Sequence, residues 1–194
     1  MALLYVVVSG VVLTAVVLIT VFILRLFGIL RNGYEYKPGQ KGSVSVLVVA
    51  GSDTDKMSEE KIRAFEAERK ESDSTSQFTL HRIPRSREVR QSWSSSVLSS
   101  LSALMSSVPL VFRLHPDMVL CNGPGTCVPL CAAGLLLGVL GLKRVLIVYV
   151  ESICRVETLS LSGKILYYLS DYFFVQWAPL KDKYPKAVYL GRLV

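Results

Sequence analysis

The sequence of 194 residues carries little charge for its length. Charged residues make up 19% of the chain and hydrophobic residues 51%, whereas an average soluble domain carries about 25% charged residues. The mean hydropathy of +0.43 therefore predicts that part of the chain contacts lipid. A chain of this length has room for one domain and one appendage.

Motifs that would indicate a cofactor or a metal are absent. No G-x-G-x-x-G follows the first predicted strand, residues 44–50, which excludes a nicotinamide oxidoreductase of the Rossmann type. The four cysteines contain no C-x-x-C pair, so their spacing predicts no structural zinc site. We expect no cofactor, no metal, and four reduced thiols in a cytosol-facing domain: Cys121, Cys127, Cys131 and Cys154.

Acidic residues are scarce outside one stretch. The chain has 22 Lys and Arg against 15 Asp and Glu, a net charge of +7, and eight of the acidic residues lie within residues 53–73. The remainder is strongly basic, which suits an anionic membrane surface, phosphates or nucleic acid. Nucleic acid is the poorer interpretation, because no aromatic residues alternate with the basic ones and no nucleic-acid-binding motif is present.

The first thirty residues predict a membrane anchor. From Leu3 to Leu24 the chain has no charged residue, and a helix of this length, about 33 Å, would cross a hydrocarbon core of about 30 Å. The alternative, a cleaved signal peptide, requires a basic start, a shorter apolar core and a small-residue cleavage site. Basic flanks favour the cytosolic side. We therefore expect a lumenal N-terminus, an anchor helix over residues 1–30 that acts as a plain tether, a linker over residues 31–43 and a cytosolic remainder.

Beyond residue 43, strand-like apolar runs alternate with helical patterns. This alternation is typical of right-handed βαβ units. The predicted fold class is α/β: one transmembrane helix followed, over residues 44–194, by a Rossmann-like open parallel sheet with flanking helices. The first strand is a continuous β-branched run, typical of burial on both faces. Strands are expected at 44–50, 78–83, 118–121, 145–150, 172–177 and 188–190, and helices near 58–70, 97–108, 127–140 and 163–169.

The helix near residues 97–108 has the clearest periodicity. Its apolar residues recur on one face, opposite a face of serines, and Pro109 is expected to end it. We expect the apolar face to pack on the sheet; it consists of Val97, Leu98, Leu101, Leu104, Met105 and Val108.

A basic segment precedes this helix. Arginine makes bidentate contacts with phosphate, and tryptophan favours the membrane interface. The segment therefore predicts a surface that lies on anionic lipid or binds a lipid-linked diphosphate, and the alternative is a solvated basic turn. Its residues are Arg82, Arg85, Arg87, Arg90 and Trp93.

Two loops after predicted strands carry candidate site residues, because ligands of open α/β sheets bind beyond the carboxyl ends of the strands. In the loop 122–126, two glycines permit close approach to the backbone, and the N–H groups at the following helix start favour an anion such as a diphosphate. A tight turn without a ligand is the alternative. The predicted diphosphate site consists of Asn122, Gly123, Gly125 and Thr126.

The second loop, residues 151–158, places two carboxylates and an arginine at one strand end. Glu151, Arg155 and Glu157 suit sugar hydroxyls, a phosphate or a general base. An ion-paired surface loop is the alternative. The loop 51–55 after the first strand contains two aspartates, which would repel phosphate, so we expect no phosphate loop there.

Five segments of the cytosolic part have distinctive sequences. They are residues 83–89 (I-P-R-S-R-E-V), 117–129 (D-M-V-L-C-N-G-P-G-T-C-V-P), 148–160 (V-Y-V-E-S-I-C-R-V-E-T-L-S), 171–177 (D-Y-F-F-V-Q-W) and the ending 189–192 (Y-L-G-R). Together they resemble the eukaryotic membrane subunit of the dolichyl-diphosphate N-acetylglucosamine transferase. The resemblance extends over residues 44–194.

The resemblance implies one half of a two-chain enzyme of the GT-B type at the endoplasmic reticulum membrane. This family supplies the membrane anchor and the acceptor side, and a soluble catalytic partner binds UDP-GlcNAc. The pair adds the second, β1,4-linked GlcNAc to GlcNAc-diphosphate-dolichol. In the family the C-terminal end docks the catalytic partner, which by position implicates Tyr189, Leu190, Gly191, Arg192, Leu193 and Val194.

One departure from the family pattern lies near residues 52–53. The family follows its first strand with a G-S-G-G-H-T loop, a helix and a second strand before A-D-T-D-x-M-S, whereas here Gly51-Ser52 runs straight into D-T-D-K-M-S. The glycine loop and its histidine, a candidate base, are therefore missing, and the sheet is expected to have an exposed edge. Two hypotheses follow: an acceptor-side subunit of an active transferase, with Glu151 or Glu157 as base, or an inactive scaffold that recruits the partner to the membrane.

Overall fold

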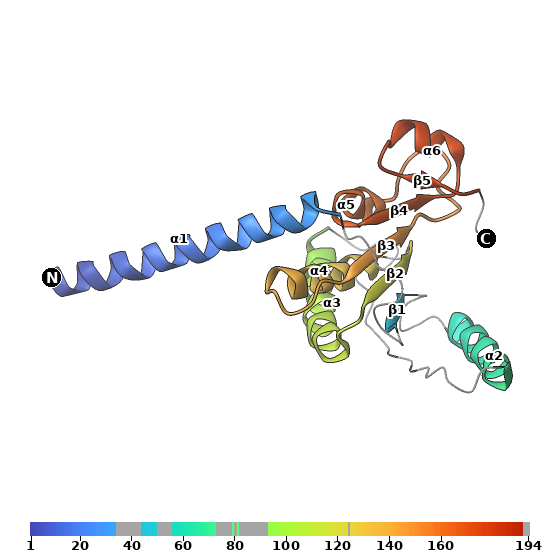
Figure 1. The fold of residues 1–194 in the computed structure, drawn as a ribbon, viewed down its shortest axis with the longest axis horizontal. Helices are drawn as coiled ribbons and strands as arrows, with labels where there is room; N and C mark the ends of the chain where they lie inside the picture. Colours follow the sequence, from blue (N-terminus) through green and yellow to red (C-terminus); the bar gives the residue numbers. More distant parts are fainter. Residues whose placement is uncertain are drawn as a thin grey trace.

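The computed structural model describes residues 1–33, 44–49, 56–72, 79, 81, 93–123 and 125–191. Figure 1 shows a long helix, α1 (Ala2–Arg31), that projects away from an α/β unit. The part of α1 over Val7–Arg31 is long and apolar enough to cross a membrane, and its most apolar stretch is not buried inside the protein. The predicted anchor helix is therefore present, and the predicted linker lies mostly outside the described residues.

The five strands of the described residues form one parallel sheet, in the order in which they occur in the chain (Figure 1). The open parallel sheet predicted from the sequence is thus confirmed. The expected strand at 78–83 falls mostly outside the described residues, and Thr79 and His81 belong to no strand. The strands are β1 (Val46–Val49), β2 (Met118–Asn122), β3 (Leu146–Val150), β4 (Tyr172–Val175) and β5 (Val188–Tyr189).

The helices that connect these strands lie on one face of the sheet. A sheet that grows in one direction through right-handed crossovers places every connecting helix on the same side. On that side lie α4 (Cys127–Val139), α5 (Leu161–Leu169), α6 (Ala178–Lys183) and, beside α4, α3 (Trp93–Leu114). Of these, α6 was not predicted. The core between this sheet face and the helices includes Val119, Cys121, Ile147, Tyr149 and Phe173, all fully buried.

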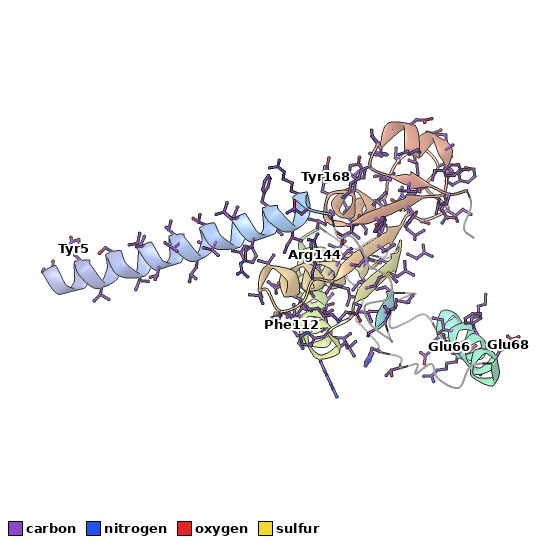
Figure 2. All side chains as sticks on the ribbon, viewed as in Figure 1. Tyr5, Glu66, Glu68, Phe112, Arg144 and Tyr168 are labelled. Atoms are coloured by element: carbon purple, nitrogen blue, oxygen red, sulfur yellow. The ribbon has the colours of Figure 1, made fainter. Side chains whose placement is uncertain are left out.

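The opposite face of β1 is open, and the prediction that this strand is buried on both faces is wrong. Val46 is 42% exposed and Val48 57%, whereas Val49, which points toward the helices, is 5% exposed. The reason is the one-sided arrangement of the connecting helices. The remaining helix, α2 (Lys56–Ser72), was predicted, but it stands apart from the sheet, with Glu66 and Glu68 on it (Figures 1 and 2).

The face of α3 that packs inward carries small residues, which corrects the expectation from periodicity in part; of the predicted apolar face, Val108 does pack against the core. Ala103, Ser107 and Val111 are fully buried, and α3 packs most extensively against α4. Small side chains let two helices approach closely, and the buried Ser107 hydroxyl donates to the Ala103 carbonyl oxygen at 2.7 Å. The large residues of the opposite face stay outside: Leu98 is 70% exposed, Leu101 54% and Met105 70%.

Pro109 does not end α3, contrary to expectation. The helix continues to Leu114, although proline removes one backbone hydrogen bond and commonly breaks a helix. Val111, just beyond the proline, is fully buried in the core cluster, and Phe112 packs against that cluster. Burial of these side chains offsets the lost hydrogen bond.

The open face of β1 predicts a strong contrast between neighbouring valines. Val49→Ala removes buried methyl groups and should lower the free energy of unfolding by about 2 kcal/mol. Val48→Ala lies on the exposed face and should change it by less than about 0.5 kcal/mol. Thermal unfolding of the detergent-solubilised chain measures both changes. Equal losses for the two variants would mean that the outer face of β1 is covered.

Candidate functional site

Two loops meet at the carboxyl edge of the sheet, where the neighbouring strands β2 and β3 end. A Cβ placed on Gly123 would lie 3.4 Å from the Cβ of Ser152, so the loops 122–126 and 151–158 are in contact there. Gly123 has φ +69°, a conformation that residues with a side chain seldom adopt. The structure therefore brings together the two loops that carry the predicted site residues.

The first loop ends at the N-terminus of α4. Thr126 is the N-cap residue, but it has helical dihedral angles and its side chain makes no capping hydrogen bond. The residue is 3% exposed, and its Oγ1 has no hydrogen-bond partner within the described part of the chain. A helix start with an uncapped first turn and a buried, unpaired hydroxyl is suited to an anion. Asn122 and Gly125 are exposed beside it.

The second loop is organised around the buried carboxylate of Glu151, which is 0% exposed. Its Oε1 accepts a hydrogen bond from the Ser152 N–H at 3.0 Å. Its Oε2 accepts from the Ser160 N–H at 3.0 Å and from the Ser160 hydroxyl at 3.1 Å. A Cβ on Gly163 would lie 2.0 Å from this Oε2, so only glycine fits there. Glu151 thus connects the end of β3 to the start of α5.

Further polar groups hold the same loop in place. The Tyr149 hydroxyl lies 3.4 Å from Glu151 Oε1, and burial raises the pKa of Tyr149, so it stays a protonated donor. From the end of β4, Gln176 Nε2 donates to the Glu151 carbonyl oxygen at 3.1 Å, and Trp177 Nε1 donates to the Ile153 carbonyl oxygen at 2.7 Å. From the sequence, Gln176 and Trp177 were expected inside the strand at 172–177, with no role in the site. In the structure β4 ends at Val175, so both residues lie directly after the strand.

Arg155 and Glu157 lie exposed in this loop, unlike Glu151. At the C-terminal end, Tyr189 is 42% exposed and Leu190 65%, and Gly191 has φ +92°. The other predicted positions lie outside the described residues: Arg82, Arg85, Arg87, Arg90, the loop 51–55, the side chain of Trp93, and Arg192 to Val194.

Three thiols lie under the first loop. Cys121, Cys127 and Cys131 are free and fully buried, with the sulfurs of Cys121 and Cys131 3.5 Å apart. Two causes raise the pKa of Cys131 well above its usual value: mainly the hydrogen bond with Cys121, and also burial of the thiol. The thiol therefore stays protonated and unreactive. Cys154 is exposed and also free. Within the described residues, no group of three or more side chains has the arrangement of a metal site.

The chain matches one protein-family model, described as oligosaccharide biosynthesis protein Alg14 like, over residues 11–193. It is 58% identical over 178 residues to the human UDP-N-acetylglucosamine transferase subunit ALG14, covering 90% of this chain and 78% of that protein. The corresponding protein of Yarrowia lipolytica is 44% identical over 149 residues, covering 77% and 67%. No solved structure matches significantly.

The alignment with the rat protein of the same name shows an internal difference. The two are 53% identical over 206 positions, which cover 91% of this chain and 94% of the rat protein. The alignment is longer than the 194 residues of this chain, so the rat protein has residues within the aligned region that this chain lacks. Because the family model matches almost the whole length, the chain belongs to the Alg14-like family of oligosaccharide biosynthesis proteins.

Proposed function

We propose that the chain is the membrane subunit of a UDP-GlcNAc transferase that adds the second, β1,4-linked GlcNAc to GlcNAc-diphosphate-dolichol. In this proposal it is anchored in the endoplasmic reticulum membrane by α1, with its N-terminus in the lumen and the α/β unit in the cytosol. It supplies the acceptor side and recruits a soluble subunit that binds UDP-GlcNAc. Membership of the family, the names of the relatives and the apolar α1 support the proposal.

The observation that carries the acceptor assignment is the N-terminus of α4. An acceptor diphosphate is anionic, and it needs N–H and hydroxyl donors in a site where the backbone can approach closely. The uncapped helix start, the positive φ of Gly123 and the Oγ1 of Thr126, unpaired within the described residues, support the assignment of such a site to this loop. Arg155, exposed on the neighbouring loop, supplies positive charge, and Asn122 supplies an amide for the sugar.

The proposed reaction is an inverting displacement. The 4-hydroxyl of the acceptor GlcNAc attacks the anomeric carbon of UDP-GlcNAc, the bond between that carbon and the diphosphate oxygen breaks, and UDP leaves. A base takes the proton of the attacking hydroxyl. Of the two predicted bases, Glu157 is exposed and a substrate can reach it. The oxygens of Glu151 are already occupied by donors from Ser152 and Ser160. We therefore assign Glu157 the role of base and Glu151 that of holding the loop.

The remaining predicted surfaces complete the proposal. Tyr189 to Val194 dock the soluble subunit, and the exposed Tyr189 and Leu190 suit such a contact. The segment with Arg82, Arg85, Arg87, Arg90 and Trp93 lies on the membrane surface.

A second function, an inactive scaffold that recruits the soluble subunit, is favoured by one observation. Within the described residues, β1 is an edge strand with an open outer face, where Val48 is 57% exposed. The rat relative has internal residues that this chain lacks, and a βα unit added beside β1 would cover such a face. If the missing unit held the catalytic base, anchoring and docking would remain without chemistry.

Co-expression of this chain with the soluble subunit in membranes separates the two functions. We expect transfer of GlcNAc from UDP-GlcNAc to a GlcNAc-diphosphate-lipid acceptor, measured as the disaccharide product. No product, with the soluble subunit still bound to the membranes, would support the scaffold. Loss of the soluble subunit from the membranes would contradict both functions.

Thr126→Val tests the diphosphate site, because it replaces the unpaired hydroxyl with a methyl group of similar shape. The variant should be at least as stable as the original chain, since an unpaired buried hydroxyl has a desolvation cost. Its affinity for inorganic diphosphate should fall about tenfold, the loss expected for one hydrogen bond to a charged group. The shift of the melting temperature with diphosphate measures this, and Thr126→Ser should retain the affinity. Equal affinities of all three chains would contradict the site.

Alanine substitutions separate the roles of the two glutamates. Glu151→Ala leaves several buried donors without an acceptor and should destabilise the chain by about 3 kcal/mol. Glu157→Ala should leave the melting temperature unchanged and lower the transfer rate at least about 100-fold, the usual effect of losing a general base. A transfer rate within twofold of the original in Glu157→Ala would show that the base lies elsewhere.

A further inference from the structure

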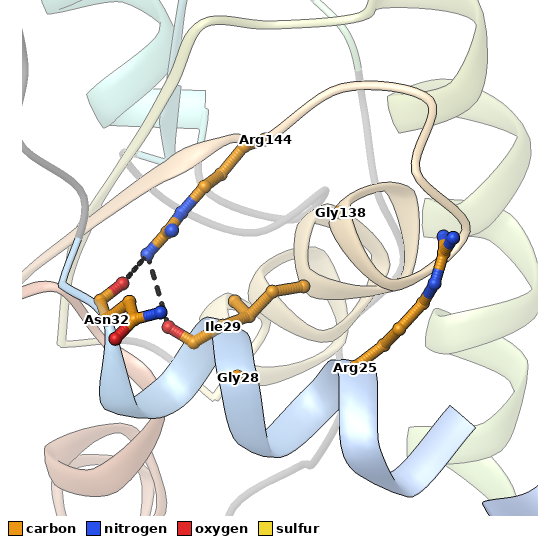
Figure 3. A pocket seen from close by; sticks show the side chains of 6 residues that line it. All are labelled: Arg25, Gly28, Ile29, Asn32, Gly138 and Arg144. Atoms are coloured by element: carbon orange, nitrogen blue, oxygen red, sulfur yellow. Dashed lines mark hydrogen bonds between the residues drawn. The ribbon is translucent and has the colours of Figure 1, made fainter. Parts of the chain in front are cut away.

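The C-terminal ends of α1 and α4 lie side by side, and an arginine at or just after each end donates hydrogen bonds to the last carbonyl groups of the other helix (Figure 3). Arg25 of α1 donates from Nη1 to the Val139 carbonyl oxygen at the end of α4, at 3.3 Å. In return, Arg144, which follows α4, donates from Nη2 to the Ile29 carbonyl oxygen at 3.1 Å and also to that of Asn32. The last carbonyl groups of a helix have no partner within the helix. Each arginine therefore supplies a hydrogen-bond donor to the terminal carbonyl groups of the neighbouring helix. The two helices are thereby docked.

Glycines allow this close approach. A Cβ on Gly138 would lie 3.3 Å from the Ile29 side chain, and a Cβ on Gly141 would lie 2.8 Å from Arg25 Nη1. Gly141 also has φ +76°, a left-handed conformation that is typical of the residue after a helix end, here that of α4. The expectation that α1 is a plain tether therefore does not hold, because its last two turns pack against the α/β unit.

The position of Arg25 in α1 indicates how deep this part of the chain lies in the membrane. It is the first charged residue of the α1 sequence, after the uncharged segment that ends at Leu24. A charged side chain at this point of a spanning helix lies at the boundary between acyl chains and headgroups. Because Gly141 and Val139 contact Arg25, the loop between α4 and β3 lies at the same depth.

This loop presents two large apolar side chains. Leu140 is 51% exposed and Leu142 59%, and they flank Gly141. The basic residues Lys143 and Arg144 follow directly and make ion pairs with Asp117 at 2.9 Å and Asp171 at 3.7 Å. The leucines therefore sit at the tip of a loop whose base is fixed to the sheet.

We propose that Leu140 and Leu142 insert into the bilayer beside α1, so that the α/β unit has a second membrane contact at a fixed orientation. The occupant of this surface is lipid, because the docked helix holds the loop at headgroup level and exposed leucines next to basic residues suit the boundary with the acyl chains. The proposal depends on α1 crossing the membrane and not on the reaction assigned above.

Lipid contact can be measured with a fluorescent label on single cysteines in the full chain, reconstituted into phosphatidylcholine vesicles. Leu140→Cys and Leu142→Cys are labelled in a Cys154→Ser background, because Cys154 is exposed while the other cysteines are buried. Leu161→Cys, with a side chain 53% exposed on α5, is the matched control. Nitroxide groups near the headgroup end of the acyl chains should quench labels 140 and 142 at least about threefold more than label 161.

Equal quenching at positions 142 and 161 would overturn the proposal. A second result would also overturn it: fluorescence of the labels at 140 and 142 that nitroxide lipids do not quench but that changes when the soluble subunit is added. A protein would then cover this surface.

A second variant tests the docking. Gly138→Leu forces a side chain against Ile29 and should lower the quenching of label 142 to the level of label 161, while resistance to alkaline extraction shows that α1 still spans the membrane. Gly10→Leu is the control, since a Cβ on Gly10 meets no atom within 4 Å, and it should leave the quenching unchanged. Unchanged quenching in Gly138→Leu would show that docking does not hold the loop at the bilayer.

Discussion

The Arg144 guanidinium joins the anchor to the sheet. It donates to carbonyl groups at the end of α1 and pairs with Asp171, the residue before β4. Asp171 in turn accepts from the Ile147 N–H in β3 at 2.9 Å. The neighbouring Lys143 pairs with Asp117, the residue before β2, at 2.9 Å. The amino edge of three strands is thus tied together where α1 arrives, and Figure 2 shows Arg144 between α1 and the sheet.

The carboxyl edge is organised by a second charged group, the carboxylate of Glu151, which is stabilised by hydrogen bonds from neutral groups. Glu151 lies wholly in the interior, and a carboxylate there is stable only if its oxygens are hydrogen-bonded. Donors from Ser152, Ser160 and Tyr149 meet this requirement. One edge of the sheet therefore carries the anchor, the other carries the candidate site, and α4 connects the two.

Much of this arrangement was predictable from the sequence. The strands around 118–121, 145–150 and 172–177 have apolar runs, and parallel pairing alone places the loops after β2 and β3 together. What the sequence could not reveal is which apolar face is covered. Periodicity groups Leu98, Leu101 and Met105 on one side of α3, but the small residues on another side allow tighter packing against α4. For the same reason the docking of α1 escaped prediction, because it depends on close approach at Gly138 rather than on any apolar pattern.

The order of the strands shows which functions the loss of a βα unit would affect and which it would leave intact. Additional strands would join the sheet beyond β1, at the edge opposite β5. Four strand spacings of about 4.8 Å put β5 about 19 Å from that edge. The proposed docking residues begin at Tyr189 in β5 and continue beyond it, and the anchor contacts α4 and the segment before β3. Anchoring and docking therefore depend on parts of the fold that are present. Chemistry that requires a residue of the missing unit would be lost. The two proposed functions differ in that one requirement alone.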